Sequence, residues 1–165
     1  MNFCLMSYHT HIHSSLLIHV IFSTKDRIAF LDDRQIVSRL IHYMKAITKD
    51  LQSPLIRANA FKDHIHLLVS LSPKVSVSNW VKEMKRMSSI WIKKQDASLS
   101  KFSWQPGSAS FSVSYSNRQK VVEYIDNQQI HHQNKDFIVE LNHLFRLHQM
   151  ALDDNCVTDT IEVHE

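Results

Sequence analysis

The hydrophobic and polar positions of the chain follow two periods, one typical of buried strands and one typical of amphipathic helices. Short aliphatic runs such as Leu16–Phe22 are bounded by polar turns and predict strands. Apolar residues that recur every three or four positions, as from Ile36 to Ile47, predict helices. We expect strands over Leu16–Phe22, Leu55–Phe61, His64–Ser70 and Phe111–Ser114, with a tight turn at Lys62–Asp63. We expect helices from Asp32 or Asp33 to about Asp50, over Ser76–Gln95, over Asn117–His132 and around Phe137–Phe145.

The order of these elements predicts the fold class. Strand, helix, strand, strand, helix, strand is the ferredoxin-like arrangement, an α+β fold similar to that of RNA-recognition modules. It gives an antiparallel sheet with helices on one face, so we expect the other face to be open for a substrate. We assign residues 14–150 to this single domain with its additional C-terminal helices, residues 1–13 to a poorly ordered leader, and residues 151–165 to an acidic tail.

Composition narrows the functional classes. The chain holds a single glycine, Gly107, which excludes the glycine-rich loops of nucleotide-binding motifs. No apolar run approaches the roughly 18 residues that span a bilayer, so we expect no membrane association. Cys4 and Cys156 have no metal-ligand spacing and suit a reducing cytoplasm. A net charge of +3 permits a polyanionic partner without establishing one.

Two histidines in the third predicted strand form the strongest chemical signal. Side chains alternate between the faces of a strand, so His64 and His66 point to the same side while Ile65 points to the other. Two imidazoles on one face of an inner strand are able to hold a metal ion. The pair therefore predicts a metal site on the sheet.

The third predicted helix carries residues that complement this pair. Tyr124 and Gln128 are four positions apart, which places them on one face of a helix. A tyrosine hydroxyl is a competent nucleophile once a metal or base activates it, and an amide oxygen is able to serve as a third, neutral metal ligand. Such a ligand set leaves coordination positions for phosphate oxygens and water.

Together these motifs resemble those of the HUH single-tyrosine transposases of the smallest bacterial insertion sequences. The resemblance rests on His64-Ile65-His66 followed by Tyr124-Ile125-Asp126-Asn127-Gln128 and the pair His131-His132. It extends over about residues 14–150 through three further stretches, which are His19–Lys25, Ser88–Ile92, and Trp104-Gln105 with Phe111–Ser114.

The resemblance implies a set of roles. His64, His66 and Gln128 would hold a divalent ion, Mg²⁺ or Mn²⁺, and Tyr124 would attack single-stranded DNA to form a 5′-phosphotyrosine link. Family members are homodimers that bind DNA hairpins at the element ends, which implies a cytoplasmic protein associated with the bacterial nucleoid. A histidine-rich site also accepts Co²⁺ and Zn²⁺, so the residues alone leave the ion open.

Several alternatives remain at this stage. Tyr115 rivals Tyr124 as nucleophile, and His11/His13 form a second His-x-His pair in the leader. Asp63 is either a turn residue or an orienting partner for a histidine. The lysines and arginines of the second helix are candidates for DNA contact. A non-cleaving single-stranded nucleic-acid-binding protein derived from a transposase is the main alternative function, and a hydrolytic metalloenzyme ranks below it.

Overall fold

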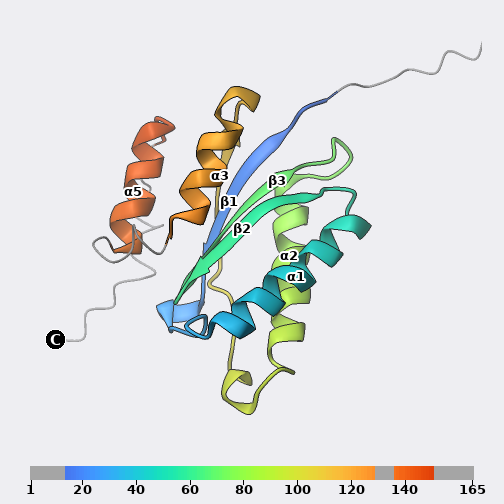
Figure 1. Cartoon of the computed structure of the whole chain (residues 1–165), viewed down its shortest axis with the longest axis vertical. Coiled ribbons are helices and arrows are strands. Elements are labelled where there is room, and N and C mark those ends of the chain that lie inside the picture. Colours follow the sequence, from blue (N-terminus) through green and yellow to red (C-terminus); the bar gives the residue numbers. More distant parts are fainter. Residues whose placement is uncertain (1–13, 129–135, 151–165) are drawn as a thin grey trace, which may run out of the picture.

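The computed structural model describes residues 14–128 and 136–150, in which four strands form one antiparallel sheet (Figure 1). The order of the strands in the sheet is β2-β3-β1-β4, so β3 and β1 are the inner strands. The strands are β1 (Leu17–Ser23), β2 (Leu55–Phe61), β3 (His64–Ser70) and β4 (Ala109–Val113). The helices are α1 (Arg34–Asp50), α2 (Val77–Ile92), α3 (Arg118–Asp126) and α5 (Phe137–Leu147), with three short 3₁₀ turns at Lys25–Arg27, Ala97–Leu99 and Tyr115–Asn117.

This architecture confirms the predicted ferredoxin-like α+β fold. Predicted β2 and β3 match the structure residue for residue, and the ends of the other strands shift by at most two positions. Asp33 caps α1 by accepting the backbone N–H groups of Gln35 and Ile36, so the second of the two expected capping residues is the one used. None of the helices described is long and apolar enough to cross a membrane.

The main core lies between the sheet and helices α1 and α2. Each inner strand turns every second side chain toward these helices, as Ile65 and Leu67 do from β3. On the helices, Leu40, Met44 and Trp80 are fully buried against them. This layer fixes the position of β3 and hence of any side chain on its opposite face.

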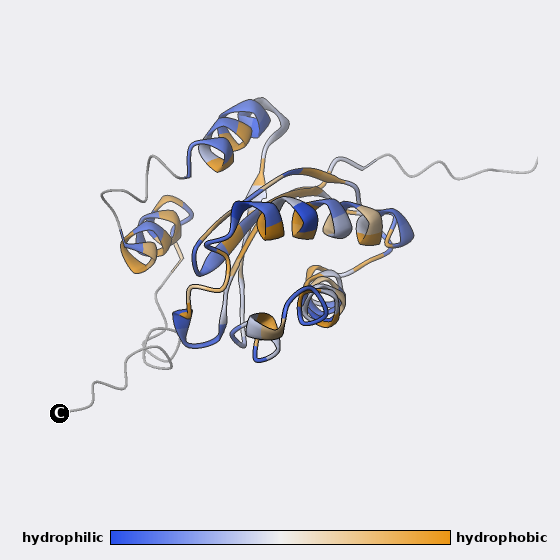
Figure 2. Cartoon of the chain, turned by 60° about the horizontal axis from the view of Figure 1, so that its bottom comes forward, coloured by the Kyte–Doolittle hydropathy of each residue, from blue (hydrophilic) through white to orange (hydrophobic). Residues whose placement is uncertain are grey.

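The opposite face of the sheet is covered in part by α3 and α5, so the expectation of an open face is wrong (Figures 1 and 2). Ile21 of β1 and Phe111 of β4 pack there against Phe137, Leu144 and Phe145, which form the apolar stripe of α5. Figure 2 shows α3 as mostly hydrophilic, whereas α5 also carries hydrophobic residues on its exposed side, among them Val139 and Leu147. An amphipathic helix must bury its apolar stripe, and the alternate side chains of β1 and β4 provide the surface.

The third helix is shorter than predicted. It ends at Asp126, with Asn127 as its C-cap, instead of continuing to His132. The side-chain amide of Asn59 on β2 donates to the backbone carbonyl oxygens of Ile125 (2.9 Å) and Asp126 (3.3 Å). A neighbouring strand therefore satisfies carbonyl groups that a continuing helix would have bonded itself. The predicted leader, the acidic tail and His131–His132 lie outside the described residues.

Candidate metal and tyrosine site

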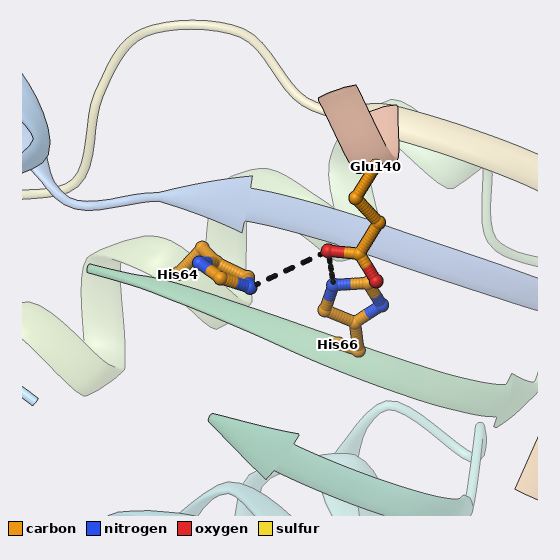
Figure 3. Close-up of side chains that lie close together, drawn as sticks. All are labelled: His64, His66 and Glu140. Carbon is orange, nitrogen blue, oxygen red and sulfur yellow. Dashed lines mark ion pairs between the residues drawn. The ribbon is translucent and has the colours of Figure 1, made fainter. Parts of the chain in front are cut away.

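The two predicted histidine ligands lie side by side on β3, on the face turned away from α1 and α2. His64 pairs with Phe61 of β2 and with Ser23 of β1, while His66 pairs with Asn59 and Ile21. Both histidine side chains are fully buried. Their shared orientation confirms the prediction made from strand alternation (Figure 3).

Each histidine has a second residue that orients its ring. Nδ1 of His64 lies 2.7 Å from Oδ1 of Asp63, and Nδ1 of His66 lies 3.0 Å from Nε2 of His19. A carboxylate only accepts hydrogen bonds, so Nδ1 of His64 carries a proton, and Nε2 is the ring nitrogen that faces Glu140. Partners of this kind fix the tautomer and the angle of metal-binding histidines.

Asp63 is therefore both a turn residue and an orienting residue. Its other carboxylate oxygen, Oδ2, accepts a hydrogen bond from Nε of Arg27 at 3.0 Å. Burial would raise the pKa of Asp63, but the hydrogen bonds and charges of His64 and Arg27 outweigh it and hold the pKa below its usual range. Asp63 thus stays ionised at neutral pH and accepts the hydrogen bond from Nδ1 of His64, which leaves Nε2 as the nitrogen available to a metal ion.

Arg27 connects this network to α5 from a strained position. Its backbone has a φ of 53°, in the left-handed region that non-glycine residues rarely occupy. The guanidinium bonds both Asp63 and, at 2.8 Å, Asp136 at the N-terminus of α5. Left-handed backbone costs about 1–2 kcal/mol at such a residue, which the two ion pairs help to offset.

Tyr124 brings its hydroxyl to the same place from α3. The hydroxyl donates a short hydrogen bond to Oε1 of Glu140, and the ring lies 5.9 Å from the ring of His66. Burial, followed by the hydrogen bond and negative charge of Glu140, raises the pKa of this hydroxyl well above its ordinary value. The tyrosine hydroxyl is therefore neutral at physiological pH.

Gln128 lies beyond the end of α3, whose last residue is Asp126. Its side chain is nevertheless fully buried, and neither its amide oxygen nor its amide nitrogen has a hydrogen-bond partner among the described residues. Such groups are costly to bury unless something else binds them. An amide oxygen bound to a metal would remove part of that cost, so Gln128 fits the role of a ligand.

Glu140 is a candidate site residue that the sequence reasoning missed. It comes from α5 and is 7% exposed. Its carboxylate lies over both histidines, with Oε2 at 3.7 Å from Nε2 of His64 and 3.5 Å from Nε2 of His66 (Figure 3). A signal was present in the sequence, since Glu140 falls three residues after Phe137 and four before Leu144, on the apolar stripe of its helix. A carboxylate in a buried stripe needs a partner.

Two further expectations receive an answer from the structure. Tyr115, the rival nucleophile, is 75% exposed in a 3₁₀ turn, and its hydroxyl makes no described contact with the histidines. The basic residues of α2 lie across the sheet from the histidine pair, and Lys85 among them bonds the backbone oxygens of Gln105 and Gly107. The α2 surface is thus separated from the candidate site. His11 and His13 lie outside the described residues.

The comparisons with known proteins agree with this fold. The family described as "Transposase IS200 like" matches residues 12–128, which is well over half of the chain. The protein therefore belongs to the IS200-like transposase family. No curated protein sequence matches the chain significantly.

Solved structures share the fold, among them the following two. One is a crystal structure described as a putative transposase from Deinococcus radiodurans R1, with a TM-score of 0.57 and 22% identity, over 74% of this chain and 98% of that one. The other is described as a REP-associated tyrosine transposase bound to a REP hairpin, with a TM-score of 0.56 and 17% identity, over 77% of this chain and 74% of that one.

Proposed function

We propose that this transposase cleaves and rejoins single-stranded DNA through a covalent link to Tyr124, with the help of a divalent metal ion. One observation carries the proposal. The Tyr124 hydroxyl comes from α3, and the Nε2 atoms of His64 and His66 come from β3. All three atoms lie close to the carboxylate of Glu140. A candidate nucleophile and a candidate metal-binding pair thus occupy one buried cluster.

The residues present fit a bound metal ion. We assign His64, His66 and Gln128 as ligands, because both histidines are oriented by Asp63 or His19 and Gln128 buries polar atoms without a hydrogen-bond partner among the described residues. Mg²⁺ and Mn²⁺ are the ions we propose. Such an ion supplies positive charge that polarises a phosphate and favours ionisation of a nearby hydroxyl.

The chain's own residues then account for the reaction. The Tyr124 oxygen forms a bond to the phosphorus of one phosphodiester, and the bond from that phosphorus to the 3′ oxygen breaks. The departing 3′ oxygen ends as a hydroxyl after taking up the proton that the tyrosine loses, and the 5′ side stays attached to Tyr124. The link conserves the energy of the diester, so attack by a 3′-hydroxyl rejoins the DNA by the reverse of the same step.

We propose single-stranded DNA hairpins as substrates, supported by the structural neighbour whose title describes a bound REP hairpin. A homodimer and a cytoplasmic, nucleoid-associated location also remain predictions for this chain. Within the described residues, His64, His66 and Tyr124 come together in a single chain, with the tyrosine helix held on its own sheet by the ion pair of Arg57 with Asp126.

The decisive experiment is a test for a covalent adduct. The full chain is incubated with single-stranded hairpin DNA from the flanks of its own gene, with Mn²⁺ or with chelator, and separated on a denaturing gel. We expect an adduct in Mn²⁺ that chelator abolishes and that Tyr124→Phe eliminates. Tyr115→Phe is the matched control and should retain the adduct, because the Tyr115 side chain is 75% exposed to solvent.

An adduct that persists in Tyr124→Phe would overturn the assignment of the nucleophile. Hairpin binding that survives chelator, without an adduct at any metal concentration, would instead support the alternative of a non-cleaving nucleic-acid-binding protein. The complete burial of His64 and His66 is the one observation that favours this alternative, because DNA must gain access to them before cleavage.

A further inference from the structure

Glu140 occupies a position that the proposed ligand set does not use. Its carboxylate reaches down from α5 over β3 (Figure 3), and its two oxygens have different neighbours. Oε1 accepts the hydrogen bond from Tyr124, whereas Oε2 lies near the Nε2 atoms of His64 and His66. One buried carboxylate therefore touches both halves of the site.

The distances to the histidines suit ligands of a shared ion better than direct hydrogen bonds. Separations of 3.5 and 3.7 Å are too long for ordinary hydrogen bonds between nitrogen and oxygen. Two ligands that each lie about 2.1 Å from one ion are about 3.0 Å apart at a right angle and about 3.4 Å apart at a tetrahedral angle. The spacing is thus close to that of ligands around a single ion, and the ligand atoms of all three residues lie within 4.8 Å of one another.

The packing of α5 shows that Glu140 is held in this position. Phe137, one turn earlier, stacks on the His64 ring with 4.4 Å between ring centroids. At the N-terminus of the helix Asp136 pairs with Arg27, and at its other end Phe145 packs against Phe111. The carboxylate is therefore positioned from both sides along the helix, as a preorganised ligand should be.

We propose that Glu140 is a metal ligand and that its carboxylate links the metal to the nucleophile. One oxygen would bind the ion together with His64 and His66, while the other positions the hydroxyl of Tyr124. The inference rests on the metal site of the proposed function and adds a negatively charged ligand to it. Two histidines and one carboxylate form a ligand set that suits Mn²⁺, Co²⁺ and Zn²⁺.

The proposal is tested by metal binding without DNA, on the full chain. Mn²⁺ affinity is measured from the loss of the free-ion signal in electron paramagnetic resonance. We expect Glu140→Gln, which keeps the size and a hydrogen-bond acceptor for Tyr124 but removes the charge, to weaken Mn²⁺ binding by about tenfold or more. Glu83→Gln is the matched control on α2, across the sheet, and should bind Mn²⁺ like the wild type.

A second readout tests the link to Tyr124. Zn²⁺ titration should produce an ultraviolet difference spectrum of tyrosine in the wild type that is lost in Tyr124→Phe and in Glu140→Gln. A spectrum that persists in Glu140→Gln would overturn the link. Unchanged Mn²⁺ affinity in a folded Glu140→Gln protein, as judged by its thermal melt, would overturn the ligand assignment.

The failure of this inference is distinguishable from failure of the proposed metal site. His66→Ala should abolish Mn²⁺ binding if the site is correct. Loss of Mn²⁺ binding in His66→Ala but not in Glu140→Gln would overturn the assignment of Glu140 alone. Wild-type affinity in both variants would overturn the metal site itself. If Glu140→Gln does not fold, Glu140→Asp replaces it, because it keeps the charge but withdraws the carboxylate by one methylene. Unchanged affinity in that variant would also overturn the assignment.

Discussion

The two faces of the sheet are built from the same strands but have opposite characters. On the face toward α1 and α2, β3 presents Ile65, Leu67 and Val69, and all three join one large apolar cluster. On the other face, β3 presents His64 and His66, which lie among polar groups beneath a much smaller apolar cluster. Successive side chains of a strand point to opposite faces, so neighbouring residues of β3 belong to different faces.

The difference shows which face stabilises the fold and which face is arranged for chemistry. Burial of apolar surface contributes roughly 25 cal/mol per Å², so the larger cluster dominates stability. Buried polar groups cost free energy unless they are bonded, and His19 and Glu140 are both buried beside His66 on the second face. A sequence selected for stability alone would place apolar side chains there.

The largest effect on this comparison should come from Leu67→Ala on the core face. Leu67 is fully buried in the large cluster, so its truncation leaves a cavity and should lower the free energy of unfolding by about 3 kcal/mol. Urea denaturation measures the loss, and Leu147→Ala, at a position that is 64% exposed, is the matched control. The folded fraction should bind Mn²⁺ with unchanged affinity. A tenfold weaker Mn²⁺ affinity would show that packing on the core face also determines metal binding on the other face.

On the other face, His19→Leu should have a smaller effect, and it should weaken metal binding instead of lowering the free energy of unfolding. The imidazole of His19 is the partner of Nδ1 of His66, so its loss removes the group that orients a proposed ligand. We expect Mn²⁺ affinity to fall by about 10- to 100-fold. Isothermal titration calorimetry measures this change.

His19→Gln is the control for a positioning role, because its amide is able to accept a hydrogen bond from Nδ1 of His66. It should recover part of the affinity that His19→Leu loses. Equal affinities in wild type and His19→Leu would show that the contact is only structural.

The two faces also differ in how far the sequence predicts them. The core face follows from local periodicity, because β3 and α1 display their buried positions at regular spacing. The histidine pair follows from the same rule. The strand order was also accessible, since the order of elements along the chain limits the topology to few choices.

The rest of the candidate site depends on contacts between distant elements. No glycine or proline follows Asp126 to mark the end of α3. Instead, the side-chain amide of Asn59 on β2 donates hydrogen bonds to the last carbonyl groups of the helix. Glu140 reaches the histidines only because α5 packs on β1 and β4. A charge on its apolar stripe indicated burial, but periodicity alone does not identify the partner.

The smallest effect should come from Asp136→Ala, which tests how α5 is fixed over the site. Asp136 caps the helix by accepting the backbone N–H of Ile138, and it also pairs with Arg27. Loss of a cap of this type costs about 1 kcal/mol. Amide hydrogen exchange within α5 should therefore accelerate about fivefold at pH 7, while exchange in β3 changes less. Asp136→Asn, which preserves a capping oxygen, should show a smaller acceleration.

The pH dependence of this effect has a defined sign. The hydrogen bond from Ile138, with the further contribution of Arg27, lowers the pKa of Asp136. A carboxyl group with a lower pKa in the folded state stabilises it fully above the unfolded pKa of about 3.9, and this stabilisation is lost as the pH falls through the folded value. The difference between wild type and Asp136→Asn should therefore shrink below about pH 4. A difference that widens in acid would mean that the charge of Asp136 does not hold α5 in place, and the cover of the second face would then rest on its apolar stripe alone.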